Sequence, residues 1–347
     1  MELFPCNLVL LLLPLIFLPL YFLVKFSHHK HNIPPGPPKL PITGNLHQLG
    51  KPPHHILHKL SQKYGPVMLL QLGSVPTVVI TSAEAAEQVL KTYDLDFCTR
   101  PPFAGPKRLT YNYLDILLLA LIYEKGAIRD LHLSPERNKS EHKDLIDVLL
   151  KIKKDGSSTV RLTNDHIKAV LLDVFLAGVD TSAVTMNWAM VELARNPDAM
   201  KKVQGEIRNY VGTAKGKVEE SELGQFLYLK MVVKETLRLL PPGPLLLPRE
   251  CTKHHVISGY DVYPNTRILI NAWAIGRNPE YWDKPDQFIS ERFKDFSIDF
   301  TGGQNFDLAP ISMELILANL PYCFNWELPK GMKMEDKALR NIGDRYS

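Results

Sequence analysis

The sequence predicts a mainly α-helical protein with a small β-sheet region, preceded by an N-terminal transmembrane helix. Residues 3–24 carry no charged side chain, as a segment that spans a membrane requires. Apolar residues recur at helical spacing from Thr163 to Asn196, which predicts one helix long enough to cross most of a domain. Strand patterns are short, and the clearest pair covers 67–73 and 77–81 around a Gly-Ser turn.

Composition and charge exclude several classes of protein. A chain of 347 residues with 45% hydrophobic side chains is long enough to bury a core and is not disordered. Its 41 basic and 37 acidic residues leave a formal net charge of +4, so no nucleic-acid partner is expected. The four cysteines lie far apart without a C-x-x-C pair, which argues against a disulfide framework or a structural zinc site: Cys6, Cys98, Cys251 and Cys323.

The uncharged N-terminal run is predicted to be a retained membrane anchor over residues 1–26. As a helix, residues 3–24 would be roughly 33 Å long, enough to cross a hydrocarbon core of about 30 Å. The alternative is a cleaved signal peptide, but only Glu2 precedes the run and no A-x-A site follows it. Basic residues follow instead, so the positive-inside rule places the rest of the chain in the cytosol: Lys25, Lys30 and Lys39.

Residues 27–50 are predicted to be a proline-rich hinge. The cluster Pro-Pro-Gly-Pro-Pro at 34–38 favours polyproline geometry, which makes a stiff spacer. Its place after a short basic stretch resembles the hinge of microsomal cytochromes P450. The next segments resemble that family's first helix and strand pair, and Phe-Cys-Thr-Arg-Pro-Pro at 97–102 is typical of its plant members. The resemblance implies an incomplete cytochrome P450 domain over 51–347.

One stretch of the long helix breaks its apolar pattern: Ala177-Gly178-Val179-Asp180-Thr181-Ser182. A glycine inside a helix costs about 1 kcal/mol relative to alanine, so its presence needs a reason. The stretch resembles the oxygen-activation motif of the family. By that resemblance Ala177 and Gly178 widen a groove beside the haem, and Asp180 and Thr181 relay protons. The alternative is an ordinary polar patch on a helix surface.

A second motif is Glu235-x-x-Arg238, on a helix predicted over 229–240. Spacing of three puts both charges on one helix face, and an isolated pair of this kind is usually a solvated one worth a few tenths of a kcal/mol. Before a proline cluster, however, the motif resembles the family's E-x-x-R helix. The segment around Arg292 resembles its Pro-Glu-Arg-Phe element, with Ser290 in the place of proline. The resemblance implies that Glu235, Arg238 and Arg292 form a buried structural network.

The sequence departs from the family at two places. The family binds iron through a cysteine thiolate on a loop just before its last long helix. Here Pro310 runs directly into Ile311 and that loop is missing, while Cys323 matches the far end of the helix. A second gap opens near Asp115, after which residues 144–150 already resemble a region several helices later. The chain therefore looks like an abridged copy, as a skipped exon, a faulty gene model or a decayed gene would give.

The resemblance implies a haem-thiolate monooxygenase that oxidises a small apolar substrate of specialised metabolism. Its cofactor is haem, with Arg249 at a propionate. Its electrons come from NADPH-cytochrome P450 reductase, and its domain lies on the cytosolic face of the endoplasmic reticulum membrane. Because no thiol stands where the iron ligand belongs, no metal ligand is assigned and this chain is expected to be inactive. The alternative is a non-catalytic, membrane-anchored remnant that contacts other membrane proteins.

Overall fold

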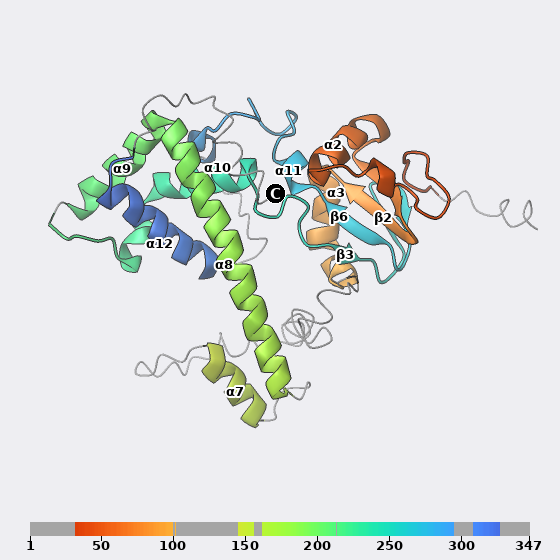
Figure 1. Ribbon diagram of the computed structural model, residues 1–347, viewed down its shortest axis with the longest axis horizontal. Helices are drawn as coiled ribbons and strands as arrows, with labels where there is room; N and C mark the ends of the chain where they lie inside the picture. Colours follow the sequence, from red (N-terminus) through yellow and green to blue (C-terminus); the bar gives the residue numbers. More distant parts are fainter. Residues whose placement is uncertain are drawn as a thin grey trace, which may run out of the picture.

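A computed structural model describes residues 32–99, 101, 145–155, 162–212, 214–294 and 308–326. Figure 1 shows two groups of elements: a small sheet with its covering helices, and a bundle of helices around the long helix α8. The predicted fold class, mainly helical with a small β-sheet region, is confirmed. The predicted membrane anchor at 1–26 lies outside the described residues.

The β-lobe is built on a four-stranded mixed sheet. In the strand order β1-β2-β6-β3, β1 and β3 run antiparallel to their neighbours, and β2 pairs with β6 in parallel. The sheet buries Val67, Ile80 and Ile268 against Val89 and Phe97 of the adjoining helical turns. A second sheet is the hairpin β4–β5. The elements of this lobe are η1 (Leu46–Gln48), α2 (Pro53–Tyr64), β1 (Val67–Leu72), β2 (Val75–Ile80), α3 (Ala83–Glu87), η2 (Gln88–Thr92), η3 (Asp94–Phe97), β3 (Arg249–Glu250), β4 (His255–Ile257), β5 (Tyr260–Val262), β6 (Arg267–Ile270) and α11 (Ala272–Ile275).

Local sequence sets the ends of these elements. The Ser82 hydroxyl caps α3 by accepting a hydrogen bond from the amide of Ala85 at 3.4 Å. Strand β6 ends at Ile270 because the Asn271 side chain accepts from the amide of Ala274 at 3.1 Å and starts a helical turn there.

The helical lobe is built around α8. Thr163, where the predicted helical run starts, caps this helix, and His166 completes a capping box with it. The C-terminal half of α8 packs on α9, α10 and α12 through Leu193, Ile207 and Leu317, while α7 packs on its N-terminal half. The elements are α7 (Leu145–Asp155), α8 (Asn164–Arg195), α9 (Pro197–Val211), η4 (Glu220–Gln225), α10 (Leu227–Leu239), η5 (Ser290–Phe293) and α12 (Leu308–Cys323).

The middle of α8 is apolar but exposed. Val174, Phe175 and Val179 are 48%, 65% and 50% exposed. Among the described residues, α8 is the helix whose length and composition would let it cross a membrane, and 18% of its most apolar stretch is buried. Apolar surface of this kind is normally covered in a folded protein.

The hinge packs against the sheet. The sequence predicts a spacer over 27–50, but the carbonyl of Pro35 accepts a hydrogen bond from the amide of Leu69 at 2.8 Å. A Cβ on Gly36 would lie 2.0 Å from the carbonyl oxygen of Leu69, so this close approach requires glycine. The part of the hinge after residue 34 is therefore an edge of the β-lobe.

A pH dependence of stability follows from His54 in α2. His54 is 4% exposed, and its ring packs against His55 and Trp273, with ring centroids 4.4 and 5.3 Å away. Burial, then the neighbouring charges of His55 and Arg277, lower the pKa of His54 from 6.5 to about 4. The unfolded chain therefore binds the proton first, and stability falls as the pH drops from about 6.5 to about 4, by at most roughly 3 kcal/mol.

Replacing this histidine tests the effect. Urea unfolding of the detergent-solubilised chain at pH 7 and pH 5 should show a smaller pH difference for His54→Phe than for the unmodified protein, because the replacement has no proton to bind. An unchanged pH difference in this variant would contradict the role given to His54.

Candidate functional site

The predicted oxygen motif lies in the exposed middle of α8. Ala177, Asp180 and Thr181 are exposed, and Gly178 is half-buried. The hydroxyl of Thr181 donates to the carbonyl of Ala177 within the same helix, and that of Thr185 donates to the carbonyl of Thr181 at 2.8 Å. The motif thus forms one continuous helical turn, with its acid and its first alcohol on the solvent side.

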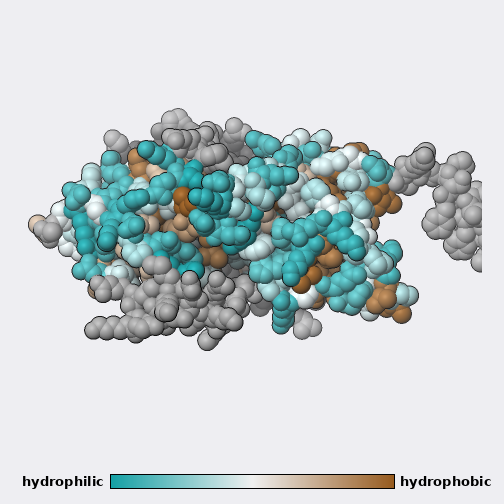
Figure 2. Space-filling model, turned by 90° about the horizontal axis from the view of Figure 1, so that it is seen from above, coloured by the Kyte–Doolittle hydropathy of each residue, from teal (hydrophilic) through white to brown (hydrophobic). Residues whose placement is uncertain are grey.

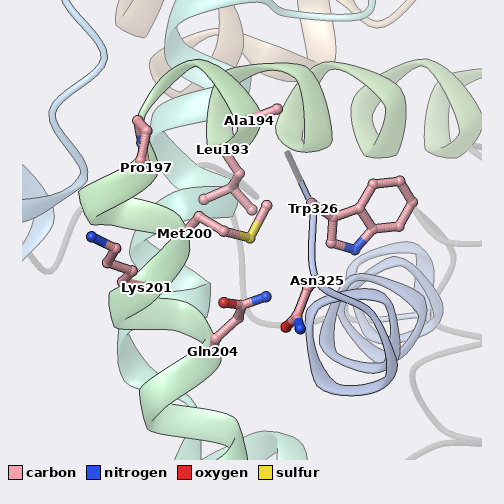
Figure 3. A pocket seen from close by; sticks show the side chains of 8 residues that line it. All are labelled: Leu193, Ala194, Pro197, Met200, Lys201, Gln204, Asn325 and Trp326. Atoms are coloured by element: carbon pink, nitrogen blue, oxygen red, sulfur yellow. The ribbon is translucent and has the colours of Figure 1, made fainter. Parts of the chain in front are cut away.

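A cavity of about 410 Å³ lies elsewhere on the helical lobe. Figure 3 shows it at the junction of α8 and α9, with Leu193 and Met200 facing Trp326 and with Lys201 pointing away. Thr181 is twelve residues before Leu193, which is roughly 18 Å along the helix. The lining contains none of the predicted site residues, so this cavity does not extend the oxygen motif.

Glu235 lies at the centre of a buried ion-pair network. Its side chain is fully buried, and Arg238 binds it through two hydrogen bonds, Nε to Oε2 at 2.7 Å and Nη2 to Oε1 at 2.8 Å. The Nε of Arg292 donates to the same Oε1 at 3.1 Å, and the amide of Ile289 donates to it at 2.8 Å. The structure therefore brings Glu235, Arg238 and Arg292 together around one carboxylate.

The remaining guanidinium donors of the network hold a loop of backbone. Arg238 donates to the carbonyls of Gly276, Pro285 and Gln287, and Arg292 donates to that of Asp283 at 2.8 Å. Both guanidinium groups lie over the ring of Trp282, at 5.2 and 5.9 Å. Buried charges are tolerated when they are paired and hydrogen-bonded, as the carboxylate and the two guanidinium groups are here.

A second E-x-x-R pair, which was not singled out from the sequence, lies at the end of α8. Glu192 and Arg195, at the end of α8, pair at 3.0 Å, and Glu192 is 6% exposed. Burial raises the pKa of this carboxyl, against the opposing charge of Arg195. Its spacing equals that of Glu235 and Arg238, so a search for the pattern finds it. Spacing gives no sign that the carboxylate is buried, because that depends on helices distant in sequence.

Arg249 is a half-buried cation on β3. Its Nη1 donates to the carbonyl of Phe97 at 3.4 Å, and burial lowers its pKa. Within the described ranges, no carboxylate lies within ion-pair distance of it. A partly buried cation of this kind suits an anionic group such as a haem propionate.

The described thiols do not fit a haem iron ligand. Cys251 is buried, and burial raises its pKa to about 11, so it is a neutral thiol. Cys98 is half-buried, and its Sγ lies 3.1 Å from the carbonyl oxygen of Leu95. Cys323 is exposed at the end of α12, with its Sγ 3.9 Å from the carbonyl oxygen of Gly216. The chain offers a cation for a propionate, but residues 295–307, the segment directly before α12, contain no cysteine.

Comparisons with known proteins agree with this picture. A sequence model described as cytochrome P450 matches residues 34–120 and 112–341. Cytochrome P450 71B35 of Arabidopsis thaliana is 36% identical over 469 aligned positions, which cover 94% of this chain and 93% of the relative. The 4-hydroxyphenylacetaldehyde oxime monooxygenase of Sorghum bicolor is 33% identical, with 96% and 92% covered. A zebrafish cytochrome P450 solved with abiraterone aligns with a TM-score of 0.70 at 22% identity, covering 83% of this chain and 94% of its own.

The chain belongs to the cytochrome P450 family. Its alignment with the first relative has 469 positions, although the chain has 347 residues, so the relative carries segments that have no counterpart here. The two family matches overlap at 112–120, which includes Asp115, where the sequence analysis places a gap. The prediction of an abridged family member is confirmed.

Removing the central charge tests the network. Glu235→Gln leaves Arg238 and Arg292 buried without their countercharge, so we expect the free energy of unfolding to fall by about 3–5 kcal/mol. Glu87→Gln is the matched control, because Glu87 and Lys91 form an exposed pair whose loss costs less than about 1 kcal/mol. Urea unfolding followed by circular dichroism measures both. Equal small losses in the two variants would show that the buried network contributes little.

Proposed function

We propose that this chain is an abridged, membrane-anchored cytochrome P450 that has lost thiolate haem ligation and does not catalyse monooxygenation. The Sorghum relative is named as a monooxygenase of an oxime. The ancestral activity is then oxidation of a small apolar molecule of specialised metabolism, with electrons from NADPH-cytochrome P450 reductase at the endoplasmic reticulum membrane.

The missing cysteine is the observation that carries this proposal. Haem-thiolate chemistry requires a sulfur ligand, which pushes electron density onto the iron and favours cleavage of the oxygen–oxygen bond. Residues 295–307, which precede α12, contain no cysteine. Cys323 lies at the opposite end of that 16-residue helix, roughly 22 Å along its axis from Leu308. Moving this thiol to the ligand position would require the helix itself to move.

The retained motifs mark descent from an active enzyme. By position, Asp180 and Thr181 correspond to the proton relay of the family, and Ala177 and Gly178 to its groove. In this chain the hydroxyl of Thr181 is bonded within its own helix, and Asp180 is on the solvent side. Arg249 keeps a cation suited to a propionate. Under this proposal no thiolate-bound haem is present for these groups to contact or to supply with protons.

A second role, contact with another membrane protein, is favoured by one observation. The exposed apolar side chains of Val174, Phe175 and Val179 form a surface that a stable protein normally covers. A chain that has lost its catalytic ligand but folds cooperatively fits this role.

Carbon monoxide spectroscopy tests the proposal. The full chain is purified from cells supplied with haem, reduced and exposed to carbon monoxide. We expect no shifted Soret band of a thiolate-ligated haem, because no thiol is in place to ligate the iron. An intact plant relative prepared in parallel is the positive control.

A shifted Soret band in the unmodified chain would contradict the proposal. Serine variants of the four cysteines (Cys6→Ser, Cys98→Ser, Cys251→Ser and Cys323→Ser) would then identify the ligand, since the band disappears only when the ligating sulfur is removed. A cooperative unfolding transition without the band supports the non-catalytic role.

A further inference from the structure

The cavity at the junction of α8 and α9 has the composition of a small-molecule site. Its volume of about 410 Å³ lies within the range of roughly 300–1,000 Å³ that such sites occupy. Leu193 and Met200 form its floor and are 0% and 4% exposed, and Trp326, which is 40% exposed, stands opposite them (Figure 3). Small-molecule sites are lined by apolar and aromatic side chains, with a few polar groups that fix the orientation of the ligand.

The surface around this junction favours a small molecule over a protein partner. Figure 1 places the junction of α8 and α9 near the top of the molecule, and Figure 2 views the chain from above. On the face seen there, the brown areas of the helical lobe are small and set among teal surface. A concave site bordered by polar surface suits a small ligand, whereas a stable protein interface needs a much broader contact.

Arg208 of α9 holds one wall of the cavity in place. Its Nη2 donates to the carbonyl oxygen of Phe324 at 3.0 Å, and its Nη1 donates to the Oδ1 of Asn325 at 3.0 Å. The indole Nε1 of Trp326 donates to the carbonyl oxygen of Leu320 at 3.0 Å. These bonds fix the end of α12, and the residues that follow it, against α9. The cavity is therefore formed before a ligand enters.

Two amide side chains, Gln204 of α9 and Asn325, lie at the end of the cavity away from α8 (Figure 3). The Nε2 of Gln204 donates to the carbonyl oxygen of Phe324 at 3.1 Å, and the Oδ1 of Asn325 accepts from Arg208. These bonds set the orientation of both amides. Within the residues that the structure describes, the Oε1 of Gln204 and the Nδ2 of Asn325 have no further partner. One acceptor and one donor are therefore left for a ligand.

The described lining offers no countercharge to a ligand. Lys201 is its charged residue, and the side chain points away from the cavity (Figure 3). A charged ligand would leave water without gaining an opposite charge, which is costly. The site therefore favours a neutral ligand.

We infer that this cavity binds a neutral, planar aromatic molecule that carries a hydroxyl group on its ring. The ring lies between the indole of Trp326 and the thioether of Met200, since both attract aromatic rings. The hydroxyl group donates to the Oε1 of Gln204 and accepts from the Nδ2 of Asn325, because a hydroxyl is both a donor and an acceptor. The inference does not rest on the proposed loss of haem ligation, since the lining contains none of the predicted site residues.

Fluorine NMR of the full chain in detergent, with fluorotryptophan in place of tryptophan, tests the inference. The chain has four tryptophans: Trp188, Trp273, Trp282 and Trp326. The probe is para-cresol, and toluene, which lacks only the hydroxyl group, is compared with it. We expect para-cresol to shift the Trp326 resonance saturably and to leave those of Trp273 and Trp282 in place, because these two line no part of the cavity. Toluene should bind about three- to tenfold more weakly, as the loss of a hydrogen bond predicts. Trp326→Phe identifies the resonance.

Gln204→Met tests the role given to the amides. The variant keeps the length of the side chain and removes the acceptor, so we expect para-cresol to bind about three- to tenfold more weakly and toluene to bind as before. Tyr210→Ala is the matched control, because Tyr210 is 55% exposed on the same helix and lines no part of the cavity. Partition of the probes into detergent is the same for every variant, so it cancels in this comparison.

Two results would overturn the inference. A Trp326 resonance that stays in place up to the solubility limit of para-cresol, or that moves linearly together with those of Trp273 and Trp282, would show that the cavity takes no such ligand. Equal affinity for para-cresol and toluene, or an unchanged preference for para-cresol in Gln204→Met, would show that the amides do not recognise a hydroxyl group.

Discussion

The folded part of this protein depends on one buried carboxylate. Glu235 is fully buried, yet each of its oxygens accepts hydrogen bonds from a guanidinium group, so its charge is neutralised where water is excluded. Through Arg238 and Arg292 the same charge fixes the backbone from Gly276 to Gln287, which connects α11 to η5. An abridged chain that keeps this network can therefore still hold the β-lobe and the helical lobe in a fixed relative position.

Loss of helices has a different effect on α8. This helix keeps its partners at both ends, where α7 packs on one half and α9, α10 and α12 on the other. Between them the predicted oxygen motif and its apolar neighbours are exposed. Local sequence is sufficient to form the helix, through the cap at Thr163 and the stop at Pro197, but a reaction site needs surrounding walls that exclude water. This chain can therefore form the helix that carries the motif without enclosing the motif in a reaction site.

Much of the fold could be predicted because its signals are local. The caps at Thr163 and Ser82, the stop before Pro197 and the turn between β1 and β2 are set by residues a few positions apart. The packed hinge could not be predicted, because Pro35 meets Leu69, and Asn32 meets Asp261, only in three dimensions. Burial of Glu192 was missed for the same reason. Proximity of Glu235 to Arg292 came from family resemblance, since no local rule links residues 57 positions apart.

The central claim is that no sulfur of this chain bonds a haem iron. Alkylation of the full chain with iodoacetamide, with and without added haem, followed by peptide mapping, tests it directly, because a ligating thiolate is protected from the reagent. The account predicts that the extent of modification of each of the four cysteines, Cys6, Cys98, Cys251 and Cys323, is the same in both samples, with the buried Cys251 modified little in either. Protection of one of them by haem, in proportion to the haem bound, would contradict it.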